Sequence, residues 1–169
     1  MAAENNSTGT FEATIQCPDG EKTFHANRVR MHDIITRGGA RYLVIKGFED
    51  TVNSDTGSKQ INTIQFYLEK SPARGPTTLH PPLVLPEVRA NSASYYILTD
   101  SPDDADDNVD AAWELPGQEG GEINYSIVQN GESAIGTFDF NAGTPGNHTF
   151  KIKGSFTIHH LEAEVYSSS

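Results

Sequence analysis

The sequence has a single cysteine and no apolar run long enough to cross a membrane as a helix. Cys17 is the only thiol among the 169 residues, so no disulfide can form within the chain. No stretch approaches the roughly 18 consecutive apolar residues of a spanning helix. The start, MAAENNSTGT, has neither the basic nor the apolar segment of a signal peptide. The sequence as it stands predicts a cytoplasmic protein, or an extracellular one if a leader was removed, and the compartment stays unknown.

Lysine and arginine are absent from one long interval. Between Arg89 and Lys151 there is neither, although that interval contains 11 of the 23 acidic residues. The 12 acidic residues elsewhere balance the 12 basic ones, so the net charge of −11 arises from this interval. Nucleic acids and anionic membranes are bound by positive charge, which argues against either as a partner there. Cations or a basic protein remain attractive ligands.

Sustained helical periodicity is also absent, and a period of two takes its place. Residues 121–160 contain three alternating runs, GEINYSIV, AIGTFDFN and HTFKIKGSFTIHH, separated by turn-rich links. Every second residue is apolar in a strand with one buried face, as Ile123 and Tyr125 are here. Asn130-Gly131 favours a tight hairpin between the first two runs. We therefore expect a three-stranded antiparallel meander, around which the rest of the chain is organised.

Five further strands are expected before the meander: Thr10–Ile15, Lys22–Met31, Arg41–Phe48, Ile61–Leu68 and Ser94–Thr99. The apolar centre of one of them, Tyr42 to Ile45, is continuous and indicates a strand buried on both faces. Residues 72–86 contain five of the nine prolines and predict an extended connection between sheets or edges rather than a central strand.

These patterns predict an all-β fold, a mostly antiparallel β-sandwich of seven to eight or more strands with little helix. A barrel is the second choice. We expect residues 1–9 to be a flexible lead-in, residues 10–160 a single sandwich domain and residues 161–169 a polar tail.

The strand sequences of the meander resemble a known kind of domain. Gly136–Phe140 reads GTFDF and Lys153–Ile158 reads KGSFTI. These segments resemble the late strands of small, uncharacterised β-sandwich domains common in lipoproteins of Bacteroidetes. The resemblance implies the fold and carries no activity, ligand or site residue.

The densest chemical feature is a cluster of six aspartates between Asp100 and Asp110. Carboxylates this close repel one another unless a cation lies among them, and Ca²⁺ prefers six to eight oxygen ligands. The segment lacks the D-x-D-x-D-G spacing of a calcium-binding helix–loop–helix motif. A solvated acidic surface and a site for a basic protein are the alternatives. The candidate calcium ligands are Asp103, Asp104, Asp106, Asp107 and Asp110.

Trp113, the only tryptophan, follows the aspartates directly. An aromatic ring beside carboxylates is typical of a sugar-binding subsite, and Glu114, Tyr95 and Tyr96 complete the candidate platform. The alternative is that Trp113 covers one end of the core.

Motifs of catalysis are lacking. Residues 131–136, GESAIG, differ from a nucleophile elbow because the second glycine comes one position late and because they lie in a hairpin. There is no phosphate loop and no G-x-G-x-x-G. Cys17 has no evident activating base.

We therefore expect a non-catalytic binding module, not an enzyme, with an unknown ligand. The first hypothesis is recognition of a glycan or protein near the acidic segment, assisted by Ca²⁺. The alternative is a structural protein that self-associates through an edge strand or the proline-rich residues 72–86. Neither nucleic-acid binding nor membrane insertion is expected.

Overall fold

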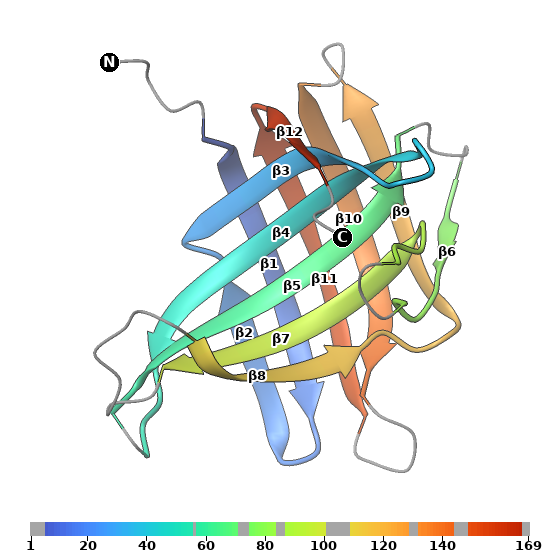
Figure 1. Ribbon diagram of the computed structural model, residues 1–169. Helices are drawn as coiled ribbons and strands as arrows, with labels where there is room; N and C mark the ends of the chain where they lie inside the picture. Colours follow the sequence, from blue (N-terminus) through green and yellow to red (C-terminus); the bar gives the residue numbers. More distant parts are fainter. Residues whose placement is uncertain are drawn as a thin grey trace, which may run out of the picture.

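The chain folds into two packed β-sheets (Figure 1). The computed structural model describes residues 6–55, 57–70, 75–83, 87–100, 109–128, 132–143 and 149–166. These residues form strands β1 to β12, six in each sheet, and include no helix. It follows that no described helix is long and apolar enough to span a membrane.

Sheet A has the order β2-β1-β11-β10-β9-β6 and is antiparallel throughout. It contains the predicted meander, because β10 pairs with both β9 and β11. Its strands are β1 (Thr8–Cys17), β2 (Gly20–His25), β6 (Thr77–Leu79), β9 (Gly121–Val128), β10 (Ser133–Ala142) and β11 (Phe150–His159).

Sheet B has the order β12-β3-β4-β5-β7-β8, and only the β12–β3 pair is parallel. Its strands run across those of sheet A in Figure 1. The expected all-β, mostly antiparallel sandwich is therefore confirmed. The strands are β3 (Arg28–Ile35), β4 (Arg41–Val52), β5 (Lys59–Glu69), β7 (Ser92–Asp100), β8 (Val109–Pro116) and β12 (Glu162–Tyr166).

The chain passes from one sheet to the other between two consecutive residues. The N–H of Ala26 donates to the carbonyl of Phe11 in sheet A at 2.9 Å, and the N–H of Asn27 donates to the carbonyl of Phe48 in sheet B at 2.9 Å. The single strand predicted over Lys22–Met31 is thus wrong. It is two strands, β2 and β3, in different sheets.

Both expected ends of the domain also differ in the structure. The predicted lead-in, residues 1–9, contains the start of β1 at Thr8 and a buried Ser7. The predicted polar tail, residues 161–169, contains β12, which pairs with β3. The pairing of Thr8 with His159 and of Glu162–Tyr166 with β3 is not reported by period-two hydrophobicity. Residues 1–5 and 167–169 lie outside the described part of the chain.

The proline-rich segment crosses between the sheets, as predicted, in its described part. β6 pairs with β9 at the edge of sheet A, and His80 then bridges to Ser92 at the start of β7 in sheet B. Residues 72–74 and 84–86 of this segment are outside the description.

Phenylalanine rings fill the space between the sheets. Phe66 of β5 lies 4.9 Å from Phe138 and 5.7 Å from Phe140, measured between ring centroids. Gly47 of β4 makes room for Phe11, because a Cβ on Gly47 would lie 2.6 Å from Cγ of that ring. A side chain at this position would therefore displace the core.

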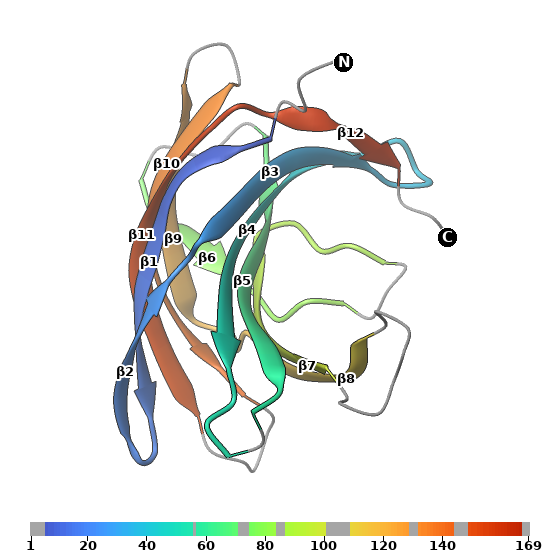
Figure 2. The same cartoon turned by 90° about the vertical axis from the view of Figure 1, so that its left-hand side faces the viewer.

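The two sheets differ in their outer faces. Along β1 buried and exposed residues alternate, whereas residues 62–66 of β5 are all buried. Figure 2 shows sheet B bending so that β12 and β3 at one edge, and β7 and β8 at the other, curve away from sheet A. The continuous run in β4 is buried on both faces at Leu43, Val44 and Ile45, as the sequence predicted.

Candidate ligand pocket at the edge of strand β3

Among the described strands, none pairs with the first half of β3 on the side away from β4. β12 pairs with β3 only from His32 onward, where His32 lies opposite Glu162. In place of a strand, Ser7 approaches this edge, and its Oγ accepts the N–H of Met31 at 2.8 Å. The same Oγ lies 2.8 Å from the carbonyl oxygen of His160 and 3.0 Å from Oε2 of Glu162.

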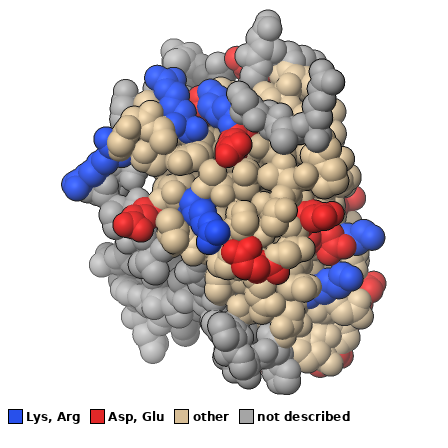
Figure 3. All heavy atoms as spheres, turned by 90° about the vertical axis from the view of Figure 1, so that its right-hand side faces the viewer, with Lys and Arg blue, Asp and Glu red and all other residues tan. Residues whose placement is uncertain are grey.

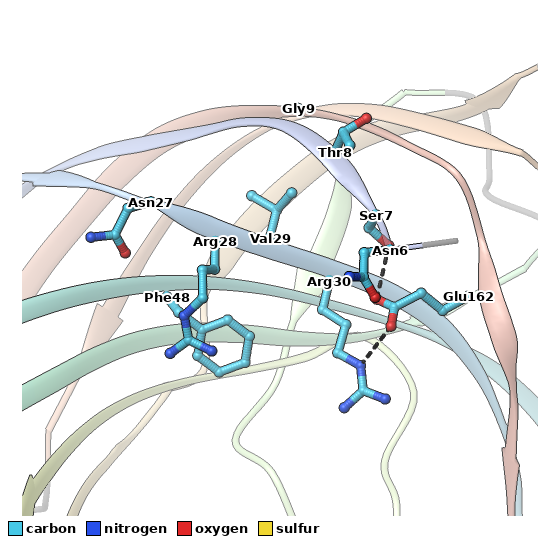
Figure 4. A pocket seen from close by; sticks show the side chains of 10 residues that line it. All are labelled: Asn6, Ser7, Thr8, Gly9, Asn27, Arg28, Val29, Arg30, Phe48 and Glu162. Carbon is cyan, nitrogen blue, oxygen red and sulfur yellow. Dashed lines mark hydrogen bonds and ion pairs between the residues drawn. The ribbon is translucent and has the colours of Figure 1, made fainter. Parts of the chain in front are cut away.

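A pocket of about 570 Å³ lies along this open edge (Figure 4). Figure 4 shows Val29 pointing to the opposite side of β3 from Arg28 and Arg30. The volume falls in the range of about 300–1,000 Å³ that small-ligand sites occupy. The lining residues are Asn6, Ser7, Thr8, Gly9, Asn27, Arg28, Val29, Arg30, Phe48 and Glu162.

Arg28 is held by two partners. Its Nε and Nη2 donate to the two carboxylate oxygens of Asp50, each at 2.8 Å. Its guanidinium also lies 4.8 Å from the centroid of the Phe48 ring. The hydrogen bond from Arg28 lowers the pKa of Asp50. Because both side chains are exposed, this pair positions Arg28 more than it stabilises the fold.

Arg30 has a partly free guanidinium. Its Nε donates to Oε1 of Glu162 at 3.2 Å, and its terminal nitrogens have no acceptor among the described residues. The Arg30 side chain is 44% exposed and that of Glu162 is 16% exposed. Arg30 can therefore accept a second anionic partner without breaking its present ion pair.

Two more nitrogen side chains lie beside Arg30 on the outer face of sheet B. Lys46 of β4 is directly opposite Arg30 in the register, and His32 follows Arg30 on the same face of β3. We call Arg30, His32 and Lys46 the outer basic cluster. Burial, and then the nearby Arg30, lower the pKa of Lys46. No acidic partner for Lys46 is found in the described ranges.

His32 has a buried nitrogen that lacks a partner within the described ranges. Its Nδ1 lies 3.3 Å from the carbonyl oxygen of Asp33, which can only accept, so Nδ1 carries the proton. Nε2 has no partner among the described residues, and His32 is 5% exposed. Burial is the largest cause that lowers the pKa of His32, while the Asp33 carbonyl raises it and Lys46 and Arg30 lower it further.

A further buried polar atom belongs to the same outer face. Thr63 of β5 lies opposite Phe48, and its Oγ1 has no partner in the part of the chain described. Buried polar groups are usually hydrogen-bonded, and unpaired ones cluster where a ligand or water completes them.

The predicted aromatic platform is corrected at Tyr95. This side chain is fully buried in the core between the sheets, and burial raises its pKa. Ligands in solvent cannot reach it there. Tyr96 lies on the opposite face of β7, and its backbone pairs with Glu114, as that of Ile97 pairs with Trp113. The side chains of Trp113 and Glu114 lie outside the description.

The calcium prediction stays a prediction. Asp103, Asp104, Asp106 and Asp107 lie outside the described residues, and Asp110 is described only as backbone of β8. Within the described ranges no group of three or more His, Cys, Asp or Glu side chains could hold a metal ion. On the side of the molecule in Figure 3, acidic and basic side chains lie interspersed among neutral ones.

The hairpin serine of the GESAIG segment has a histidine partner that the sequence did not suggest. Ser133 Oγ lies 2.9 Å from Nδ1 of His159, which is its cross-strand neighbour. A hollow of about 450 Å³ lies there, also lined by Glu132 and His160. Ser133 itself is 1% exposed, so its hydroxyl is closed off from a substrate in that hollow.

Sequence reasoning did not single out the outer basic cluster. Arg28, Arg30 and His32 alternate with Val29 and Met31, so a period-two basic pattern in a predicted strand was the available signal. Lys46 had no such signal, because only the β3–β4 register brings it to Arg30.

Comparison with known proteins gives no relative: no family model, no curated protein and no solved structure matches the chain. The fold and the pocket therefore define a β-sandwich with a basic edge site, and function is argued from these residues alone.

Proposed function

We propose that the protein is a non-catalytic binding module that takes an anionic ligand at the outer basic cluster, of which Arg30 also lines the pocket along β3. The single observation that carries the proposal is the pair Arg30 and Lys46, opposite each other on one face. Glu162 is the one carboxylate described as bonded to either of them.

The cost of this arrangement supports a binding role. Like charges on directly opposed strand positions destabilise a sheet by about 0.2–1 kcal/mol. Lys46 is also half-buried, which disfavours its charged form. A bound anion would offset both penalties, because it supplies a countercharge in addition to that of Glu162.

The donors fit an oxyanion. The free terminal nitrogens of Arg30 suit a carboxylate, sulfate or phosphate, and Lys46 adds a point charge. Protonation of His32 would turn Nε2 into a further donor. An anion favours that protonated form, so we expect its affinity to rise as the pH falls toward the pKa of His32, which burial lowers.

Calorimetric titration with citrate and with sulfate at low ionic strength tests the proposal. We expect saturable binding that Lys46→Met weakens by about tenfold or more, equal to about 1.4 kcal/mol. Lys153→Met, on the exposed outer face of sheet A, is the matched control and should leave affinity within about twofold. Absence of saturable binding, or equal weakening by both variants, would overturn the proposal.

A further inference from the structure

We infer that the natural ligand is an extended acidic peptide that adds as a strand to the open edge of β3. The inference rests on the proposed function, since it names the source of the anionic group. It adds a second recognition element, the backbone of Val29, which a small anion does not use.

The backbone at this edge is ready for pairing. Met31 donates its N–H to Ser7 and therefore directs it away from β4. N–H and C=O groups alternate in direction along a strand, and β3 pairs with β4 without a register shift. The N–H and C=O of Val29 therefore also face away from β4, and no described residue bonds to them.

The chain's own strand β12 already pairs with this edge of β3, from His32 onward. β12 adds to β3 in parallel, and its first residue, Glu162, places a carboxylate on Arg30. His160 lies just before β12 and has a positive φ of 70°. The chain therefore changes direction there, and the residues before His160 do not extend β12 along the edge of β3. A peptide that continued the line of β12 backwards would pass Val29.

The spacing of charge suits an extended peptide. Alternate residues of a strand face the same way and lie about 6.5–7 Å apart. Arg28 and Arg30 have this relation on the outer face of β3, so acidic residues at alternate peptide positions would meet both. Main-chain bonds would then supply affinity and the carboxylates specificity, as in other cases of strand addition.

Capped pentapeptides provide the test. One peptide has aspartate at its second and fourth residues, and the second has asparagine there. The third is the aspartate peptide N-methylated at its fourth residue, whose N–H would donate to the Val29 carbonyl when residue three lies opposite Val29 in the parallel direction of β12. Titration into the whole protein should show that either change weakens binding by about tenfold or more. Exchange of the Val29 amide with solvent should slow when the aspartate peptide is bound.

A variant of the protein checks the same contact. Val29→Pro removes the N–H donor on the open side of β3, where an edge strand tolerates proline. Val29→Leu keeps the donor and serves as the control. We expect the first to lose the peptide and the second to keep it, both with the melting transition of a folded protein.

The outcomes separate the two proposals. If citrate binds but N-methylation has no effect and Val29 exchange is unchanged, the strand addition is wrong and the anion site stands. If neither citrate nor any peptide binds, both proposals fail. Dimerisation of the protein alone that Val29→Pro abolishes would overturn the choice of partner, because a second copy would then occupy the edge. Should Val29→Pro not fold, the N-methylated peptide and the exchange measurement decide.

Discussion

The outer face of sheet A and the outer face of sheet B are built from similar strands but meet water differently. On sheet A polar residues such as Glu122, Thr137 and Lys153 are exposed, opposite a buried apolar face. On sheet B the outer-face residues Thr63 and Gln65 are buried although they are polar. One outer face is a solvated surface, and the other holds polar groups away from water.

This difference indicates where binding chemistry can lie. Polar groups in water already have their partners, so a ligand gains little by replacing them. His32 Nε2 and Thr63 Oγ1 are buried without a partner among the described residues, and a ligand that completes them adds interactions that water does not supply. The comparison therefore favours sheet B as the binding side.

The largest expected loss of stability comes from a substitution in the core between the two sheets. Phe66→Ala should lower the free energy of unfolding by about 3–5 kcal/mol, because Phe66 of sheet B packs against three phenylalanine rings of sheet A. Ile135→Ala, on the outer face of sheet A and 49% exposed, should change it by about 0.5 kcal/mol or less. Denaturant unfolding measures both. Similar losses for the two variants would contradict the division into core and outer face.

The acidic segment offers a rival to sheet B as the binding side. The calcium prediction expects a ligand at about 100 times its dissociation constant to stabilise the fold by about 2.7 kcal/mol. A thermal melt in EDTA and in calcium would show a midpoint higher by several degrees with the metal. The rise should disappear when the four residues Asp103, Asp104, Asp106 and Asp107 become asparagine. An unchanged midpoint would leave them as surface charges.

A threonine on each outer face sharpens the comparison. Thr63→Val removes a buried hydroxyl that has no partner in the described part of the chain, and should raise the free energy of unfolding by about 1 kcal/mol. Thr137→Val, at an exposed position of β10, should change it by about 0.5 kcal/mol or less. Chemical denaturation of both variants decides. Loss of stability in Thr63→Val would mean that its hydroxyl has a partner in solution.

The smallest expected effect is the contribution of His32 to the pH dependence of the free energy of unfolding. Burial favours its neutral form, so the unfolded chain binds the proton more readily than the folded one. Its contribution to stability is present above the ordinary pKa of 6.5 and is lost as the pH falls toward the lowered folded pKa. Unfolding followed from pH 7.5 down to about 5 should show this slope, and His32→Gln should reduce it. An unaltered slope would place the titration elsewhere.

Much of the fold follows from hydrophobic period. Phe138 and Phe140 of β10, and Ile152 and Phe156 of β11, alternate with polar residues and lie in the core. The two-residue repeat of apolar side chains indicates which face of a strand is buried, and this was enough to predict the sandwich.

The passage from β2 to β3 was not predictable in the same way. Ala26 and Asn27 carry no glycine or proline signal, yet their N–H groups bond to different sheets. Residue type does not encode which sheet a backbone joins, because that choice depends on strands far along the chain.

The site was even less accessible from sequence. Arg30 and Lys46 meet through a strand register, and Glu162 joins them from near the other end of the chain. Conversely, the clearest sequence signals, Trp113 and the aspartates, have side chains outside the description, and Tyr95 became a core residue. Chemistry assembled from distant strands leaves no local motif.

The pairing of β1 with β11 has a consequence for biosynthesis. Thr8 lies opposite His159, so β1 must wait until β11 has been made before this side of it is covered. Pairings between such distant segments fold slowly, and an uncovered strand edge in the meantime is prone to aggregation. A ribosome would release most of the chain before sheet A could close, and chaperones that mask strand edges should raise the yield of folded protein.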